Sequence, residues 1–182
     1  MKCIGTAVVV MLLMFVVVSA AGQSSTPKPA PELKKWDTSV GDWSTTGSAK
    51  DTPTGPEYKV EWYTHCHWIL SGFFLEWDTT WKGKGQEMKW LEIGSYDPIK
   101  KIHTISGFDS TGMTWANTVT FDKETSVESY TVPGPDGKVI ACRNTWVMSS
   151  DGMSTSGTGE CEENGARWTA FKVEGTKSKT AH

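Results

Sequence analysis

Apolar and polar residues alternate with a period of two along most of the chain after residue 40. The clearest case is the segment 58–70. One face of it carries Val60, Trp62, Thr64, Cys66, Trp68 and Leu70, and the other carries Glu61, Tyr63, His65 and His67. Alternation of this kind is typical of a β-strand with one buried face. The segment is therefore predicted to be a strand.

Ten segments of this type follow one another, with turn residues between them. They are 43–50, 58–70, 73–81, 88–96, 101–108, 113–121, 125–132, 138–148, 153–161 and 167–173. Even spacing without long helical segments favours an antiparallel up-and-down meander. Because closing the sheet removes its exposed edges, we expect one all-β domain, a barrel of about ten strands. The one helical candidate is short, from Glu32 to Thr38, with Pro31 at its start.

The N-terminus has the pattern of a signal peptide. Lys2 precedes the apolar run AVVVMLLMFVVV (7–18), and the small residues of VSAAG follow. A run of about 12 residues suits a signal peptide and is short for a membrane span of about 20. We expect a signal peptide at 1–22, a proline-rich flexible tether at 23–31 and the barrel domain at 32–179. The exported protein would lie in the periplasm or be secreted, without stable membrane insertion after cleavage.

The charge pattern argues against a nucleic-acid partner. The net charge is −3, from 18 basic and 21 acidic residues, and the basic residues form no stripe or block. A mildly acidic chain without a basic face lacks the phosphate contacts that dominate nucleic-acid affinity. We expect no nucleic-acid partner and a monomer or weak dimer.

Three cysteines follow the predicted signal peptide: Cys66, Cys142 and Cys161. In an oxidising compartment this number suggests one disulfide and one free thiol. If Asp151-Gly152 forms a two-residue hairpin turn, Cys142 lies opposite Cys161 and Trp146 lies opposite Gly157. A four-residue turn would instead oppose Cys142 to Gly159. The disulfide candidate is Cys142–Cys161, and Cys66, on the apolar face of its strand, would be a buried free thiol.

Several motifs together resemble a known group of proteins. They are PELKKWDTSVGDW, SGFFLEW, GSYDP, FDSTGM and NGARWTAFKVEGTK, and they extend over essentially all of 31–179. This pattern is similar to an uncharacterised bacterial family of lipocalin-like β-barrel proteins in the calycin superfamily. The resemblance implies the barrel fold. It implies no activity, because the family is defined by sequence and not by chemistry.

The resemblance also implies a structural role for the G-x-W motif, Gly41-Asp42-Trp43. In lipocalins this tryptophan plugs one end of the barrel, and an arginine from a late strand stacks on it. The only arginines in the chain are Arg143 and Arg167. We take Trp43 and Arg143 as the expected barrel-end pair, since an arginine over an indole is a favourable cation–π contact.

Tryptophan is the most prominent compositional signal, with 10 residues. Trp62, Trp68, Trp77 and Trp90 alternate along three successive predicted strands. If these faces point inward, the indoles line a ligand cavity, since barrels of this size hold one small ligand. The alternative is that the indoles simply fill the core.

Candidate metal and haem ligands are few. His65 and His67 point to one face of a strand, but a third ligand would be needed, and His103 is the only other histidine before the last residue. A related group of ten-stranded barrels binds haem through a histidine near the C-terminus, and this chain has no histidine between 104 and 181. We therefore expect no metal and no cofactor.

No sequence motif indicates catalysis. The chain has no G-x-S-x-G, no H-E-x-x-H and no phosphate-binding glycine loop, and Asp97, Asp109, Asp122, Asp136 and Asp151 occupy predicted turns. The function we expect is non-catalytic binding of a small hydrophobic or aromatic ligand inside the barrel. An enzyme using the same cavity, or a ligand-free interaction module of the cell envelope, remain the alternatives.

Overall fold

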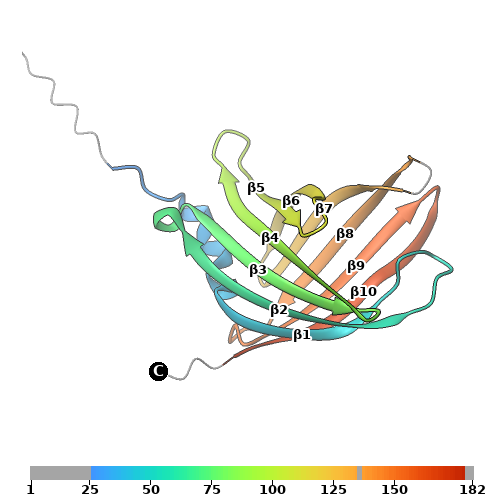
Figure 1. Cartoon of the computed structure of the whole chain (residues 1–182). Coiled ribbons are helices and arrows are strands. Elements are labelled where there is room, and N and C mark those ends of the chain that lie inside the picture. Colours follow the sequence, from blue (N-terminus) through green and yellow to red (C-terminus); the bar gives the residue numbers. More distant parts are fainter. Residues whose placement is uncertain (1–25, 135–136, 179–182) are drawn as a thin grey trace, which may run out of the picture.

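The computed structural model describes residues 26–134 and 137–178. The predicted signal peptide (1–22) and the first three residues of the predicted tether (23–25) lie outside these residues. Within them, no helix is long and apolar enough to cross a membrane. The chain forms a single closed antiparallel barrel of ten strands, as predicted (Figure 1).

Each strand pairs with its neighbours in sequence, and β1 closes the barrel against β10. The strands are β1 (Gly41–Ala49), β2 (Tyr58–Ile69), β3 (Phe74–Gly83), β4 (Gln86–Asp97), β5 (Ile102–Asp109), β6 (Thr114–Asp122), β7 (Thr125–Pro133), β8 (Val139–Met148), β9 (Ser154–Glu163) and β10 (Ala166–Lys177). Two 3₁₀ helices accompany them, η1 (Pro31–Ser39) and η2 (Leu70–Gly72). The ten alternating segments of the sequence thus correspond one to one with the strands.

Helix η1 covers one end of the barrel. Proline at its first position restrains the start of the helix, and Leu33 and Trp36 are its buried residues. They pack against Cys66, Leu75 and Ile105 of the strands. Because Leu33 and Trp36 are three positions apart, one face of a three-residue-per-turn helix brings both to the core.

The β8–β9 hairpin has the register expected from the sequence. Cys142 lies opposite Cys161 and Trp146 opposite Gly157. The turn itself is wider than expected: Ser149 N–H donates to the Ser154 carbonyl, and Gly152 alone has the positive φ, +67°. The chain therefore uses a four-residue loop, 150–153. This loop is centred on the same point as the two-residue Asp151-Gly152 turn, so Cys142 still faces Cys161. The four-residue turn that would oppose Cys142 to Gly159 is centred one residue earlier, and the chain does not form it.

Cys142 and Cys161 form a disulfide, with their Cα atoms 4.1 Å apart. Trp168 packs beside them in a second core cluster that also contacts Tyr130 and Ile140. Cys66 is a buried free thiol in the other cluster, and burial raises its pKa. The first cluster lies beneath η1, and the second surrounds the disulfide.

The expected pairing of Arg143 with Trp43 is wrong. Arg143 precedes Asn144, whose amide faces the interior and donates to Glu128, so strand alternation places Arg143 on the exposed outer face. The cation over Trp43 is the ammonium of Lys177, 5.0 Å from the ring centroid. Trp43 itself is buried at the η1 end, where its indole Nε1 donates to the Ser39 carbonyl at 2.7 Å.

Candidate functional site

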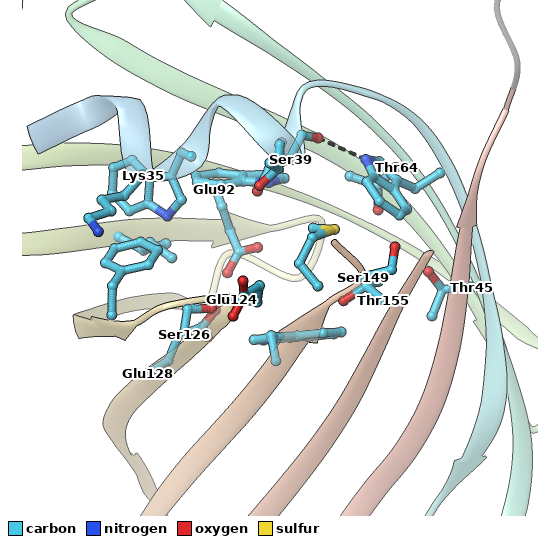
Figure 2. A pocket seen from close by; sticks show the side chains of 18 of the residues that line it. Lys35, Ser39, Thr45, Thr64, Glu92, Glu124, Ser126, Glu128, Ser149 and Thr155 are labelled. Carbon is cyan, nitrogen blue, oxygen red and sulfur yellow. Dashed lines mark hydrogen bonds between the residues drawn. The ribbon is translucent and has the colours of Figure 1, made fainter. Parts of the chain in front are cut away.

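The interior of the barrel holds a cavity of about 610 Å³. Helix η1 and the β6–β7 and β8–β9 turns contribute residues to its rim, and side chains from all strands from β1 to β9 reach it. Figure 2 shows Glu92 and Glu128 on one side of this space and Thr45 and Thr64 on the other. Its volume lies within the range of about 300–1,000 Å³ that is usual for small-molecule sites.

Tryptophan forms most of the apolar wall. Six indoles line the cavity: Trp36, Trp43, Trp62, Trp77, Trp90 and Trp146. The ring of Trp62 is central, because its centroid lies 5.9 Å from that of Trp90, 5.8 Å from that of Trp146 and 5.3 Å from that of Phe171. These edge-on and tilted contacts hold the indoles in fixed orientations.

Three of the four tryptophans expected at the cavity are there. Trp62, Trp77 and Trp90 line it, whereas Trp68 packs against the core cluster beneath η1. Trp68 is on the inward face of β2 but lies near the end of the strand. It therefore packs beneath η1 and does not line the cavity. Trp36, Trp43 and Trp146 complete the wall from η1, β1 and β8.

Glycines opposite the rings make room for them. A Cβ atom built on Gly157 would lie 2.3 Å from the Trp146 ring, and one on Gly94 would lie 2.7 Å from the Trp77 ring. An alanine at either position would therefore push an indole into the cavity. The shape of the site depends on these glycines as well as on the aromatic residues.

A hydroxyl-rich wall runs across the first three strands. Thr64 and Thr79 share a hydrogen bond of 2.9 Å between their hydroxyl oxygens, and Thr45 is buried beside them. All three threonines line the cavity. This side offers neutral donors and acceptors to a bound molecule, and no charge.

Two glutamates from strands that are distant in the sequence place their carboxyl groups in the interior. We call Glu92 of β4 and Glu128 of β7 the carboxyl pair. Oε1 of Glu92 accepts a hydrogen bond of 3.1 Å from the indole Nε1 of Trp115. Oε2 of Glu128 accepts hydrogen bonds from the side-chain amides of Asn117, at 3.3 Å, and Asn144, at 3.2 Å. The hydroxyl of Tyr130 in turn donates to Oδ1 of Asn144.

The surroundings of the carboxyl pair favour its neutral form. Burial raises the pKa of both glutamates, and the nearby charge of Glu92 raises the pKa of Glu128 further. The hydrogen bonds from tryptophan and asparagine act in the opposite direction, because they stabilise the carboxylates. Burial and the repulsion between the two carboxylates outweigh these hydrogen bonds. The carboxyl pair therefore stays partly protonated at pH values at which an exposed glutamate is fully charged.

The hydrogen-bond donors at the carboxyl pair are indole and amide groups. Such groups orient a carboxylate but do not serve as nucleophiles or general bases at neutral pH. The groups here that can carry charge or exchange a proton are the two carboxyl groups themselves, and the neutral donors around them fix their orientation.

Neither Glu92 nor Glu128 was predicted from the sequence to be a site residue. Strand alternation contains the signal, because Glu92 is two residues after Trp90, and Glu128 is two before Tyr130. Both glutamates thus share the face of an aromatic residue that points inward. Asn117 and Asn144 could be recognised in the same way, by their parity with Val119 and Trp146.

The three described histidines lie in two separate places. His65 and His67 lie on the outer face of β2, where Nδ1 of His65 is 2.6 Å from Oδ1 of Asp42 and Nε2 of His67 is 3.8 Å from Oε1 of Glu76. His103 lies inside, against Trp36 and the Glu32 carbonyl. Among the described residues, no group of three His, Cys, Asp or Glu side chains is arranged to hold a metal ion.

Comparison with known proteins identifies the fold alone. No family model and no curated protein matches the chain. The structure is similar to the crystal structure of Rv2717c from M. tuberculosis, with a TM-score of 0.60 and 12% sequence identity over 84% of this chain and 100% of that chain. At this identity the likeness shows that the two proteins share a fold, and it carries no activity from one to the other.

Proposed function

We propose that the protein is an exported lipocalin-like barrel that binds a small hydrophobic or aromatic ligand in its interior without catalysis. The observation that carries this proposal is the cavity of about 610 Å³ with six indoles in its wall. Burying an aromatic ligand against indole faces removes apolar area from water and adds favourable ring contacts. A packed, ligand-free core would leave no space of this size.

Polar groups in the wall support the binding of a ligand with a few polar atoms. The indole Nε1 of Trp62 is buried and has no hydrogen-bond partner among the described residues. An unpaired buried donor is costly, and an acceptor atom on a ligand would satisfy it. The threonine hydroxyls of β1–β3 offer further anchoring points.

Two features support the proposal of export. The first is the signal-peptide pattern at 1–22. The second is the Cys142–Cys161 disulfide, because disulfides persist mainly in oxidising compartments such as the periplasm and the extracellular space. Membership of the lipocalin-like group is likewise a proposal. It is supported by the closed up-and-down barrel, the N-terminal helix over one end and the buried tryptophan of the G-x-W motif.

The proposal is tested with the neutral fluorescent probe N-phenyl-1-naphthylamine. The chain offers a matched pair of variants on β7: Ser126 lines the cavity, and Ser129 is exposed on the outer face of the same strand. Ser126→Trp places a large ring in the cavity, whereas Ser129→Trp adds the same ring outside. Circular dichroism and the thermal midpoint establish that both variants are folded.

We expect the wild-type protein and Ser129→Trp to bind the probe with similar affinity, and Ser126→Trp to bind it at least about tenfold more weakly. Energy transfer from the cavity tryptophans to the probe reports its position. The absence of probe binding to the wild-type protein would refute the proposal, as would equal binding by the two variants.

A further inference from the structure

Among the described residues, the carboxyl pair has no cationic partner. The ion pairs of the described residues all involve other groups. Glu92 and Glu128 are half-buried in the cavity wall, and a carboxylate that loses hydration without gaining a counter-charge is destabilised. Protonation of the carboxyl pair reduces this destabilisation in the ligand-free barrel.

We infer that the ligand of this barrel is an organic cation, an amine attached to an apolar or aromatic body, whose ammonium group takes the place of the missing counter-charge beside Glu92 and Glu128. This inference deepens the proposed function and rests on it. It assigns the chemical class of the ligand and the end of the molecule that faces the carboxyl pair.

The aromatic wall suits the same ligand. Trp90 is two residues from Glu92 on the same strand face, and Trp146 is close enough to Glu128 to lower the pKa of that carboxyl group. Trp90 and Trp146 direct their N–H groups at the carboxyl pair, and their rings line the cavity wall beside it. An ammonium group at the carboxyl pair would therefore meet negative charge, while the apolar body of the ligand contacts the indole of Trp62.

The hydrogen-bonding pattern leaves acceptor capacity for an ammonium group. The hydrogen bonds described above engage Oε1 of Glu92 and Oε2 of Glu128. The indoles of Trp90 and Trp146 add weaker hydrogen bonds to Glu92 and Glu128. A carboxylate has about four acceptor positions, and an ammonium group carries three donors and no acceptor, so it can use the positions that the neutral donors leave open. A carboxylate or phosphate ligand would add a third negative group to this space.

The other charged groups at the cavity lie at its rim. Lys34 and Lys35 of η1 and Lys123 and Glu124 of the β6–β7 turn line the opening, and all four are exposed. Their charges are largely screened by water. Facing the carboxyl pair from β4, β6, β7 and β8 are Trp90, Trp115, Asn117, Tyr130, Asn144 and Trp146. Of these only Tyr130 titrates, and its pKa is raised to about 12 by burial and by the two glutamates.

The experiment compares three probes that share a naphthalene ring and a two-carbon chain. They are 2-(1-naphthyl)ethylammonium, 2-(1-naphthyl)ethanol and 1-naphthylacetate, which carry a positive charge, no charge and a negative charge. Their binding is measured by isothermal titration calorimetry at about pH 8, where the amine is still charged. The full mature protein is used, with N-phenyl-1-naphthylamine binding as the reference for an open cavity.

Two double variants give a matched comparison at equal net charge. Glu92→Gln/Glu128→Gln removes the charge of the carboxyl pair and keeps its shape. Glu160→Gln/Glu174→Gln removes two exposed glutamates from β9 and β10. Because the buried pair is already biased toward its neutral form, we expect the first variant to fold. The single variant Glu128→Gln serves the same purpose if it does not.

We expect the wild-type protein and Glu160→Gln/Glu174→Gln to bind the ammonium probe at least about tenfold more tightly than the alcohol, and the naphthylacetate most weakly. Glu92→Gln/Glu128→Gln should lose this preference and keep its affinity for the neutral probe. Ammonium binding should also release protons from the carboxyl pair, seen as different binding enthalpies in phosphate and Tris buffers.

The inference would be overturned if the alcohol or the acetate bound as tightly as the ammonium probe, or if the preference survived in Glu92→Gln/Glu128→Gln. It would also be overturned if none of the three probes bound while N-phenyl-1-naphthylamine did. In each of these cases the proposed function stands. If N-phenyl-1-naphthylamine also fails to bind, the proposed function fails, so the two failures are distinguished.

Discussion

The ammonium group of Lys177 lies 5.0 Å from the centroid of the Trp43 ring and donates a hydrogen bond of 2.8 Å to the Thr38 carbonyl. One side chain near the end of β10 thus contacts both the first strand and the last turn of η1. Since η1 forms part of the cavity rim, this contact fixes the position of the helix relative to the opening.

Lys177→Met should lower the free energy of unfolding by about 1 kcal/mol, because it removes a hydrogen bond and a cation–π contact and keeps the aliphatic stem. Arg143→Met is the control, since Arg143 is exposed on the outer face, and it should have little effect. Urea denaturation of both variants measures the difference. A larger effect of Arg143→Met than of Lys177→Met would contradict the contact of Lys177 with Trp43 and favour Arg143 as its partner.

Trp43→Ala should lower the free energy of unfolding by about 3–5 kcal/mol, in the range found for other large buried aromatics. The side chain is only 8% exposed, and its indole also donates to the Ser39 carbonyl. Trp43→Phe keeps most of the apolar contact and should cost less. An unchanged thermal midpoint in Trp43→Ala would show that the residue does not support the barrel end.

The disulfide joins two neighbouring strands across 19 positions of sequence. Its removal by Cys142→Ser/Cys161→Ser should lower the free energy of unfolding by about 3 kcal/mol, through the greater freedom of the unfolded chain. A reducing agent should lower the free energy of unfolding of the wild-type protein by a similar amount and leave that of the double variant unchanged. Equal sensitivity of both proteins to the reductant would contradict the pairing of these cysteines.

The carboxyl pair should make the stability of the barrel depend on pH. A raised pKa means that the folded protein holds these protons more tightly than the unfolded chain, in which a glutamate titrates near its ordinary value of 4.5. The stability contribution is therefore highest at or below pH 4.5 and falls as pH rises through the folded-state pKa values. The loss can reach about 1.4 kcal/mol per pH unit for each proton.

Thermal unfolding of the wild-type protein and of Glu92→Gln/Glu128→Gln between about pH 5 and pH 9 measures this effect. We expect the difference between the two proteins to shift in favour of the double variant as pH increases. A difference that is constant with pH would show that the pair titrates normally, and a shift in the opposite direction would show that the folded protein stabilises the charged form.

Strand alternation predicted the architecture well, because every strand has one buried and one exposed face. The ten segments and the inward position of Trp62, Trp77 and Trp90 follow from it, whereas the β8–β9 register followed from placing Asp151-Gly152 at the centre of the turn. The other features depend on contacts between residues that are distant in the sequence, and strand alternation does not show such contacts. The partner of Trp43 proved to be Lys177 and not Arg143, and nothing local to either residue distinguishes them. The depth of Trp68 along the barrel axis depends on where η1 docks, which periodicity does not define.

The carboxyl pair was missed for a different reason. A glutamate in a strand is normally assigned to the solvent face, and Glu92 and Glu128 are 36 positions apart in sequence. Their proximity arises only when the barrel closes through β5 and β6. Glu92 shares a strand face with Trp90, and Glu128 shares one with Tyr130, so both glutamates are expected to point inward. In barrels of this kind, a glutamate on the same strand face as an inward aromatic residue is the signal to seek.

The most direct test of the account is a crystal structure of the mature protein with 2-(1-naphthyl)ethylammonium. We expect the naphthalene ring in the cavity, in contact with the indole of Trp62, and the ammonium nitrogen within hydrogen-bond distance of Glu92 or Glu128. A barrel interior filled by its own side chains, or a ligand bound only on the outer surface, would contradict the claim that the cavity is the binding site.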